Sequence, residues 1–190
     1  TRLGGSVTAL YPVGGPTGLL LKQLVDNESV ASRTWTTAED TREDFFVQER
    51  STGQPYRFIL PGPALTEAEW QAGLALLAGM DPFPRFVVGS GSLPRGVPAD
   101  FYARIAGIAR ARGARFILDT SGPALAAAVA GGVDLIKPSL HEMQELAGGE
   151  LSDATAWETA ARALVASGKA GTIALTMGHL GALLVTSDRV

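Results

Sequence analysis

The sequence predicts an α/β fold built on a mostly parallel sheet flanked by helices. Short β-branched and aliphatic runs alternate with longer segments whose apolar residues recur every three or four positions. The short runs are apolar almost throughout, which is typical of strands buried on both faces of a parallel sheet. Hydrophobic residues make up 46% of the 190 residues, enough for such a core. Ligands of these sheets bind beyond the carboxyl ends of the strands, so the residues that follow each strand are the first candidates for a site.

The first half of the chain carries a strand, two helices and a hairpin. We expect a strand over 7–11, a helix over 17–25, a β-hairpin over 43–60 and a helix ending near residue 77. Gly53 supplies the permissive backbone that the hairpin turn needs. A hairpin inserted in an α/β chain is either a sheet edge or a lid. Thr66 and Glu69 have the spacing of a capping box, which predicts the start of the second helix.

The second half alternates regularly between strands and helices. Strands are expected over 86–88, 116–118, 135–136, 172–176 and 182–185, and helices over 98–112, 123–130, 141–147 and 153–167. This alternation is typical of βαβ units, in which successive strands run parallel. No internal repeat and no low-complexity tract interrupts it.

Composition excludes several classes of protein. The 16 Lys and Arg residues are scattered among 19 Asp and Glu residues, so the chain has no basic stripe for a nucleic acid. Arg110, Arg112 and Arg115 cluster at the end of a predicted helix, where the helix dipole favours cations. No apolar run approaches the roughly 18 residues that a membrane span requires. We therefore expect neither a nucleic-acid nor a membrane partner.

The chain contains no cysteine, which excludes disulfides, thiolate zinc ligands and a cysteine nucleophile. This composition is compatible with a reducing compartment and no signal peptide is visible, so we expect a cytoplasmic protein. The sequence begins without Met at an element junction and stops just after a strand pattern. Both ends are therefore expected to be cut.

Three predicted turns that follow strands carry polar chemistry. The stretch GSGSLPRG (Gly89–Gly96) has glycines and serines whose N–H and hydroxyl groups can approach an anion or a sugar hydroxyl. In KPSLHE, Lys137 can act as a point charge on phosphate, and Glu142 can order water around Mg²⁺. The stretch TMGHLG (Thr176–Gly181) offers a hydroxyl and two glycines. Taken singly, each is explained as well by a glycine turn or by an exposed acid at a helix start.

Familiar phosphate and hydrolase motifs are absent. No G-x-x-x-x-G-K-[ST] and no G-x-S-x-G occurs, and no G-x-G-x-x-G follows the first strand. A dinucleotide-binding oxidoreductase is therefore a poor interpretation. His141 and Glu145 have the spacing of helical metal ligands, but the absence of an evident third ligand disfavours a zinc site.

Six segments together resemble the ribokinase-like, PfkB-type sugar kinases. They are TALYPVGGPTG, YRFILPGPALTE, SGSLPRGV, DTSGPAL, IKPSLHE and TMGHLGAL, in that family's order and along nearly all 190 residues. Within the family the resemblance is closest to the 6-phosphofructokinase type. It implies a ribokinase-like α/β fold, mostly parallel and flanked by helices, in a single incomplete domain over 1–190. It also implies that 34–61 is a β lid segment that closes over the sugar and clasps a second copy, giving a homodimer.

The resemblance implies roles for single residues. Arg42, in DTRED, matches an arginine of the lid that contacts the substrate phosphate. Ser92, in SGSLP, matches a residue near the sugar phosphate. Lys137 matches a lysine near the ATP phosphates, and Glu142 matches the acid of the family's Asn-x-x-Glu motif, which is linked to Mg²⁺.

ATP is expected to bind along further residues of the second half. Thr176, Gly178 and Gly181 match the family's nucleotide-binding turn. Ser139 replaces the Asn of Asn-x-x-Glu. Its hydroxyl is shorter and offers a single donor where an amide offers two donors and an acceptor, so we expect weaker positioning of ATP or Mg²⁺. Arg95 stands where these kinases usually repeat proline. It adds a charge near the sugar loop, although a solvated turn residue explains it as well.

Two parts of the family pattern have no counterpart here. A Gly-Gly-Asn-type clamp on the sugar hydroxyls would precede Thr1, and a Gly-Ala-Gly-Asp loop would follow Val190. That loop carries the anion hole and the base that takes the proton of the sugar hydroxyl, so no catalytic base is assigned within these residues. Losing both would cost several orders of magnitude in rate, and we expect the 190 residues to be an inactive stretch of a kinase.

The function expected of the complete protein is ATP-dependent phosphorylation of fructose 6-phosphate to fructose 1,6-bisphosphate, a step of glycolysis. A tagatose 6-phosphate or fructose 1-phosphate kinase is the nearest alternative. A non-catalytic sugar- or nucleotide-binding fragment on the same fold is another, because of Ser139 and the missing base. The kinase interpretation requires the turns that carry Ser92, Lys137 and Thr176 to meet at one edge of the sheet.

Overall fold

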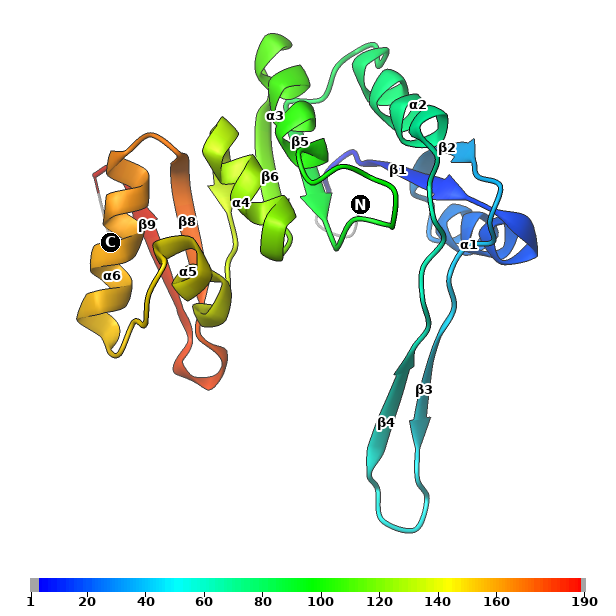
Figure 1. Cartoon of the computed structure of the whole chain (residues 1–190). Helices are drawn as coiled ribbons and strands as arrows, with labels where there is room; N and C mark the ends of the chain where they lie inside the picture. Colours follow the sequence, from blue (N-terminus) through cyan, green and yellow to red (C-terminus); the bar gives the residue numbers. More distant parts are fainter. Residues whose placement is uncertain (1–3, 189–190) are drawn as a thin grey trace. The chain divides into compact units, whose positions relative to one another are not determined.

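The computed structural model describes residues 4–188, which form two compact units (Figure 1). One unit consists of Thr1–Gly79 with Pro94–Val97, and the other of Met80–Leu93 with Pro98–Val190. The two ends at which the sequence predicts missing segments lie outside the described residues. The prediction of a single domain over 1–190 stays a prediction. No helix of the described residues is both long and apolar enough to cross a membrane.

The second unit contains the mostly parallel sheet that the strand–helix alternation predicted. Its order is β5-β6-β7-β8-β9, in which the first four strands run parallel and the last is antiparallel. The strands are β5 (Phe86–Ser90), β6 (Arg115–Asp119), β7 (Val133–Ile136), β8 (Ala170–Thr176) and β9 (Ala182–Thr186). The helices are α3 (Phe101–Ala111), α4 (Gly122–Gly131), α5 (Leu140–Ala147) and α6 (Ala154–Ala166), with a short 3₁₀ turn, η1 (Gly178–Leu180).

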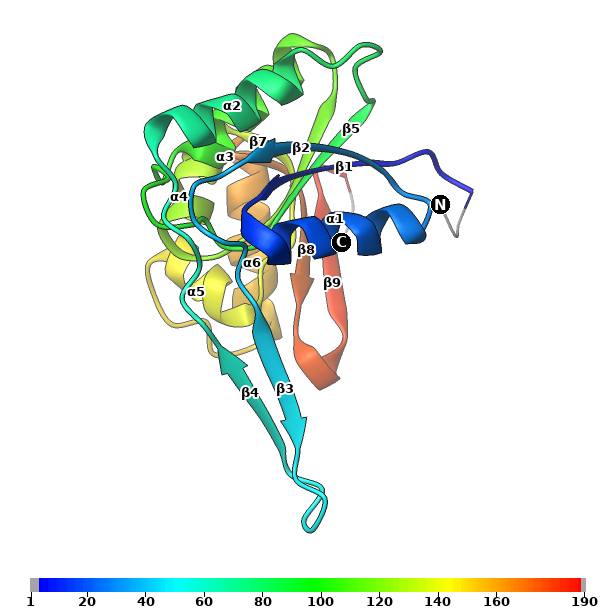
Figure 2. The same cartoon turned by 90° about the vertical axis from the view of Figure 1, so that its right-hand side faces the viewer.

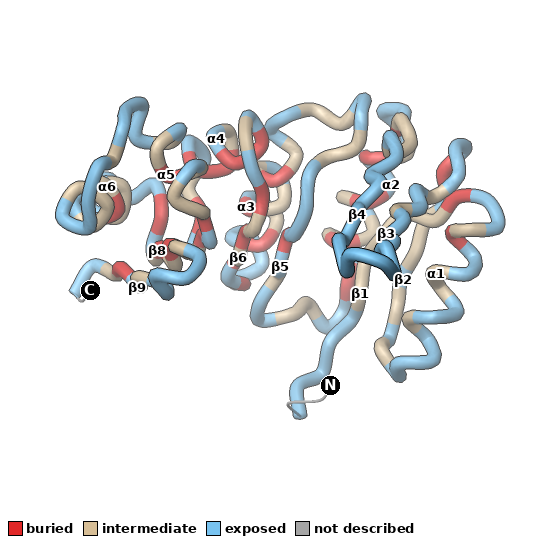
Figure 3. The backbone as a smooth tube through the Cα atoms, turned by 90° about the horizontal axis from the view of Figure 1, so that it is seen from below, coloured by how far each residue is buried: buried red, intermediate tan, exposed pale blue. Residues whose placement is uncertain are grey.

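The core of this unit lies between the sheet and its helices. Fully buried side chains come from β6, β7, β8 and β9, and they include Phe116, Leu118, Ile136, Leu175 and Val185. Figure 3 shows these buried positions as red segments along the sheet. The helices contribute small residues such as Ala109 and Ala128, both with no exposed surface, which let the backbones pack closely.

Arginines at the end of α3 hold the same core together. Arg110 donates to the carbonyl oxygens of Gly131 and Gly132, at 3.1 and 2.8 Å. Arg112 donates to the carbonyl of Met80 at 3.2 Å, and its guanidinium group lies over the Phe83 ring. Arg110 lies in the last turn of α3, as expected, but its bonds go to the carbonyl end of α4. The favourable effect of the α3 dipole on the cluster stays a prediction.

The first unit holds a parallel pair of strands with two helices. These are β1 (Thr8–Val13) and β2 (Ala31–Thr36), with α1 (Gly15–Asn27) and α2 (Glu67–Ala78). The capping box at the start of α2 is confirmed, because Thr66 Oγ1 accepts from Glu69 N while Glu69 Oε2 accepts from Thr66 N. Strand β2 was not predicted from the sequence. Four of the six residues in its ASRTWT run are polar and the strand is partly exposed, so it lacks the apolar signal of a buried strand.

The predicted hairpin is confirmed as β3 (Asp44–Gln48) and β4 (Pro55–Ile59), which run antiparallel and side by side (Figure 2). Gly53 adopts φ +72° in the turn, the left-handed conformation for which glycine was expected. Residues 34–36 belong to β2, so the regular hairpin begins only at Asp44. Apolar side chains are exposed on both faces of these strands.

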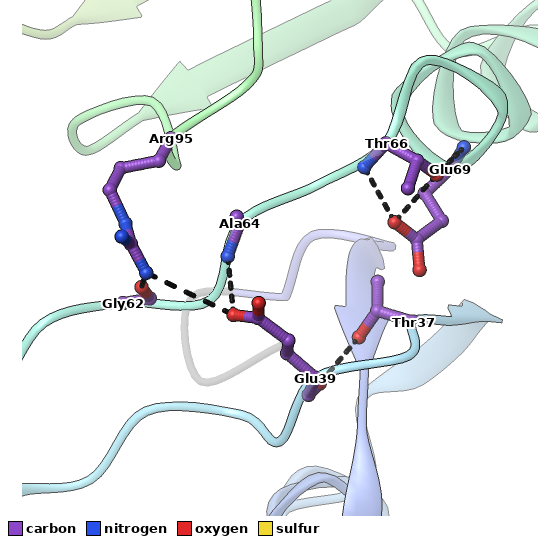
Figure 4. A network of polar contacts seen from close by, with 7 residues as sticks. All are labelled: Thr37, Glu39, Gly62, Ala64, Thr66, Glu69 and Arg95. Carbon is purple, nitrogen blue, oxygen red and sulfur yellow. Dashed lines mark hydrogen bonds and ion pairs between the residues drawn. The ribbon is translucent and has the colours of Figure 1, made fainter.

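A polar network ties together the two segments that lead into and out of the hairpin (Figure 4). Glu39, on the outgoing segment, accepts from the backbone N–H of Ala64, on the returning segment, at 2.7 Å. Arg95 donates to the carbonyl of Gly62 at 3.4 Å and lies 4.0 Å from the Glu39 carboxylate. Glu69 extends the network by accepting from the N–H of Ala38 at 2.6 Å. Two carboxylates thus hold the base of the hairpin: that of Glu69, which also caps α2, and that of Glu39.

Candidate functional site

The candidate site is the edge of the second unit's sheet where four parallel strands end. Direct hydrogen bonds link the residues that follow neighbouring strands. Gly91 N, after β5, donates to Asp119 O at 2.9 Å, and Lys137 N, after β7, donates to Leu118 O at 3.0 Å. Thr176 N, at the end of β8, donates to Pro138 O at 2.8 Å. The predicted convergence of these turns is therefore present in this unit.

Lys137 presents a cation at the middle of this edge. Its Nζ lies 3.2 Å from Asp119 Oδ1, and both side chains are 44% exposed. A pair this exposed adds little stability because solvent screens it. The ion pair nevertheless directs the Lys137 ammonium group along the sheet edge. The remaining N–H donors of this group are available to a ligand. An ammonium held in this way can bind a phosphate as a point charge.

Ser139 and Glu142 form a capping box at the start of α5. Ser139 Oγ accepts from Glu142 N at 3.3 Å, and Glu142 Oε2 accepts from Ser139 N at 2.7 Å. The family's Asn is as good a helix cap as Ser, so the substitution keeps this structural task. Glu142 Oε1 has no hydrogen-bond partner within residues 4–188. The roles of Ser139 toward ATP and of Glu142 toward Mg²⁺ stay predictions.

The residues around Glu142 fit a magnesium ion that keeps most of its water. Glu142 lines a cavity of about 240 Å³ between the start of α4, at Gly122 and Pro123, and α5. Its uncommitted oxygen can accept from metal-bound water, a mode that suits Mg²⁺ because this ion dehydrates reluctantly. Within residues 4–188 no three His, Asp or Glu side chains gather as a closed metal cage. A site shared with phosphate oxygens is therefore the form that these residues can support.

The turn after β8 joins the same edge. Thr176 Oγ1 donates to Pro138 O at 3.2 Å, which binds this turn to the segment that carries Lys137. Gly178 and Gly181 have φ of +59° and +95°, and a Cβ atom added at either would meet no neighbour within 4 Å. The backbone there is consequently open to a ligand, as a nucleotide-binding turn requires.

Arg42 belongs to the first unit, and its surroundings are described there by themselves. Its Nε lies 3.3 Å from Asp44 Oδ1, and Arg57 Nη2 lies 3.3 Å from Asp44 Oδ2. Asp44 is 21% exposed while the two arginine side chains are 41% and 65% exposed. One carboxylate thus orients two guanidinium groups at the start of the hairpin, leaving them a net positive charge.

Several residues that organise the site were not predicted from the sequence. Asp119 pairs with Lys137, and Thr120 and Tyr102 both donate to Gly91 O. Asp119 and Thr120 stand in DTSG directly after a predicted strand, which was the available signal. Tyr102 lies inside a helix, and no local pattern points from there to the turn after β5.

Comparison with known proteins gives consistent matches along the whole chain. Residues 1–190 match the family described as pfkB family carbohydrate kinase. Over 184 residues the chain is 45% identical to ATP-dependent 6-phosphofructokinase isozyme 2 of Mycobacterium tuberculosis (strain ATCC 25618 / H37Rv), an alignment that covers 97% of this chain and 54% of that protein. Over 190 residues it is 35% identical to a 1-phosphofructokinase of Xanthomonas campestris pv. campestris, covering 98% of this chain and 59% of that one.

A solved structure shows the same fold. The crystal structure of phosphofructokinase-2 from Escherichia coli in complex with fructose-6-phosphate superposes with a TM-score of 0.91 at 36% sequence identity. The match covers 100% of this chain and 63% of that chain. The chain therefore spans between about half and two thirds of the length of these relatives.

Proposed function

Because this chain belongs to the pfkB family of carbohydrate kinases, we propose that the complete protein transfers the γ-phosphoryl group of ATP to fructose 6-phosphate, giving fructose 1,6-bisphosphate and ADP. The observation that carries the proposal is the direct linkage of the turns after β5, β6, β7 and β8 at one sheet edge. Relatives that span nearly all of this chain support the same class of reaction.

Phosphoryl transfer depends mainly on positioning and on neutralising charge, and the residues of this edge offer both. Lys137 would offset, through its ammonium group, the charge that develops on the transferred phosphoryl group. Glu142 would hold Mg²⁺ through water, and the ion would supply further charge neutralisation on the phosphates. The turn that carries Thr176, Gly178 and Gly181 would hold the rest of the nucleotide against its open glycine backbone, since the N–H groups of Thr176 and Gly181 already donate within the protein.

The chemical step requires a base for the proton of the attacking hydroxyl. The hydroxyl oxygen forms the new P–O bond while the bond between the γ-phosphorus and the ADP oxygen breaks. We assign the base to the Gly-Ala-Gly-Asp loop that the family resemblance predicts, outside these 190 residues. Ser92 would contact the phosphate that the sugar already carries. Arg42, which directly precedes the hairpin in the first unit, is proposed by itself as a contact for a substrate phosphate.

The hairpin is proposed to act as a lid and as a dimer contact. On one of its faces Phe45, Val47, Tyr56 and Phe58 form cross-strand pairs, and each is between 47% and 54% exposed. An isolated two-stranded hairpin is marginally stable, and a contiguous apolar face marks an interaction site. A second copy of the chain presents the same face and is the partner that we propose for it.

The test of the function is steady-state kinetics of the complete protein. We expect ADP formation to depend on fructose 6-phosphate and the product to be the 1,6-bisphosphate. Equal ATP turnover with and without the sugar would contradict a sugar kinase. The absence of both turnover and ligand binding would contradict the kinase and the binding-protein interpretations together.

A sister specificity is the second candidate, because the chain is also similar to a 1-phosphofructokinase. Fructose 6-phosphate, fructose 1-phosphate and tagatose 6-phosphate should be compared at equal concentrations in the same assay. The highest kcat/KM identifies the substrate, and a preference for fructose 1-phosphate would replace the proposal with this alternative.

A further inference from the structure

The turn after β5 is held by an unusual set of hydrogen bonds. Gly91 has φ +98°, a conformation open to glycine and strained for other residues. Its carbonyl oxygen accepts from Tyr102 Oη at 2.9 Å and from Thr120 Oγ1 at 2.8 Å, while its N–H donates to Asp119 O at 2.9 Å. The carbonyl oxygen of Gly91 therefore accepts two hydrogen bonds, and its N–H donates a third.

The two hydroxyl donors are fixed in place by burial. Tyr102 and Thr120 are each only 6% exposed. The Tyr102 ring lies so close to Gly89 that a Cβ there would sit 2.8 Å from its Cε1, and it packs against the Phe116 ring at a centroid distance of 6.4 Å. Burial and the nearby Asp119 charge raise the pKa of Tyr102, so its phenol keeps its proton and remains a donor at neutral pH.

The orientation of Gly91 determines where Ser92 presents its donors. In a trans peptide the carbonyl of one residue and the N–H of the next point in opposite directions. The Gly91 carbonyl points to the two buried hydroxyl groups, so the Ser92 N–H is directed away from them. Ser92 is exposed, and neither its N–H nor its hydroxyl has a hydrogen-bond partner within residues 4–188. Two donors are thus held ready for an anionic ligand.

We propose that Tyr102 and Thr120 are positioning residues for sugar-phosphate binding, which act by fixing the Gly91–Ser92 peptide so that Ser92 meets the phosphate already oriented. The inference rests on the proposed function and deepens it, since it assigns two residues that do not touch the ligand to the affinity for one substrate. Without the two donors, a glycine in this conformation samples other orientations. The free energy needed to order the Gly91–Ser92 peptide when the sugar phosphate binds then lowers the affinity for the sugar phosphate.

The experiment compares Tyr102→Phe, Thr120→Val and the double variant in the complete protein. Each single variant removes one hydroxyl and preserves most of the packing, so we expect the KM for fructose 6-phosphate to rise about fivefold, with kcat nearly unchanged. The double variant is expected to raise the KM for fructose 6-phosphate more than about twentyfold, because no hydroxyl donor to the Gly91 carbonyl remains. The KM for ATP should change less than about twofold, since Lys137 and the turn after β8 are not altered.

Two controls separate positioning from general damage. Thr120→Ser restores a hydroxyl group at the same place and should return the sugar KM to that of the wild type. Tyr11→Phe removes a buried phenol hydroxyl that has no hydrogen-bond partner among residues 4–188, and it should leave both KM values unchanged. Melting temperatures show that each variant is folded. If Thr120→Val does not fold, Tyr102→Phe decides by the same criteria.

The outcomes distinguish the inference from the proposed function. A selective rise in the sugar KM that Thr120→Ser reverses supports the inference. A wild type that phosphorylates fructose 6-phosphate, with variants that leave the sugar KM unchanged or raise both KM values equally, overturns the inference alone. A wild type that neither binds nor phosphorylates the sugar overturns the proposed function and the inference with it.

Discussion

At the scale of single residues, the candidate site is made of side chains that contacts within the protein hold in place. Glu142 caps α5 with one carboxylate oxygen, and its other oxygen has no hydrogen-bond partner in the described part of the chain. Lys137 is oriented by Asp119 yet remains 44% exposed. Thr176 uses its hydroxyl to bind the neighbouring turn. Each residue is thus held by the protein before any ligand arrives, which lowers the cost of binding.

Lys137→Met tests the proposed cation at the phosphates. Methionine keeps most of the aliphatic stem and removes the charge, so we expect kcat of the complete protein to fall by about 10²-fold or more while the sugar KM changes little. Steady-state kinetics with both substrates provide the measurement. Lys169→Met, at an exposed lysine before the opposite end of β8, is the matched control and should have no effect. Equal effects of the two substitutions would contradict the assignment.

Substitutions at Ser139 separate helix capping from ligand binding. Ser139→Ala removes the cap of α5 and should lower the free energy of unfolding by about 1 kcal/mol, measured by urea denaturation. Ser139→Asn preserves the cap and adds amide donors, so stability should stay the same while the KM for ATP or the Mg²⁺ requirement falls. No gain, or a loss, in the use of ATP or Mg²⁺ would mean that the site has compensated for serine.

At the scale of elements, strands and helices bring together residues that are distant in the sequence. The parallel register of β6, β7 and β8 places their carboxyl ends at one edge. The hairpin depends on its base, where Glu39 joins the outgoing and returning segments through the Ala64 N–H. Each element therefore contributes site residues at its ends, because the side chains within the strands pack in the core.

Phe58→Lys tests the proposed contact between two hairpins. Phe58 lies opposite Phe45 on the apolar face and is 54% exposed, so a charge there should weaken a dimer that buries it by about 10²-fold. Analytical ultracentrifugation of the complete protein gives the dissociation constant. Gln54→Lys adds the same charge at the hairpin turn and should leave the dimer intact. A dimer unaffected by Phe58→Lys would exclude this face as the interface.

At the scale of the whole molecule, the geometry of the site depends on a packed sheet. Ile136 has no exposed surface and stands directly before Lys137. Pro138, on the other side of that lysine, is also fully buried. The Lys137 ammonium group is thus carried by a segment whose neighbours belong to the core, so the core and the candidate site share their stability.

Ile136→Ala tests this dependence. Deleting these buried groups leaves a cavity, and we expect the free energy of unfolding to fall by about 3 kcal/mol, with kcat lowered as well. Ile136→Val removes one methylene group and should cost only about 1 kcal/mol. Urea denaturation of both variants provides the comparison. Equal losses from the two substitutions would show that the site tolerates the cavity by collapsing around it.

The sequence by itself determined those features of the protein that depend on residues close together in the chain. Apolar periodicity predicted the parallel sheet, Gly53 the hairpin turn, and the Thr66–Glu69 spacing a helix cap, because each signal lies within one element. The quoted motifs also identified the family. Only the tertiary structure decided that Asp119 holds Lys137 and that Tyr102 and Thr120 share the carbonyl of Gly91. These contacts join residues 11 to 29 positions apart and depend on strand register and helix packing, which no local pattern encodes.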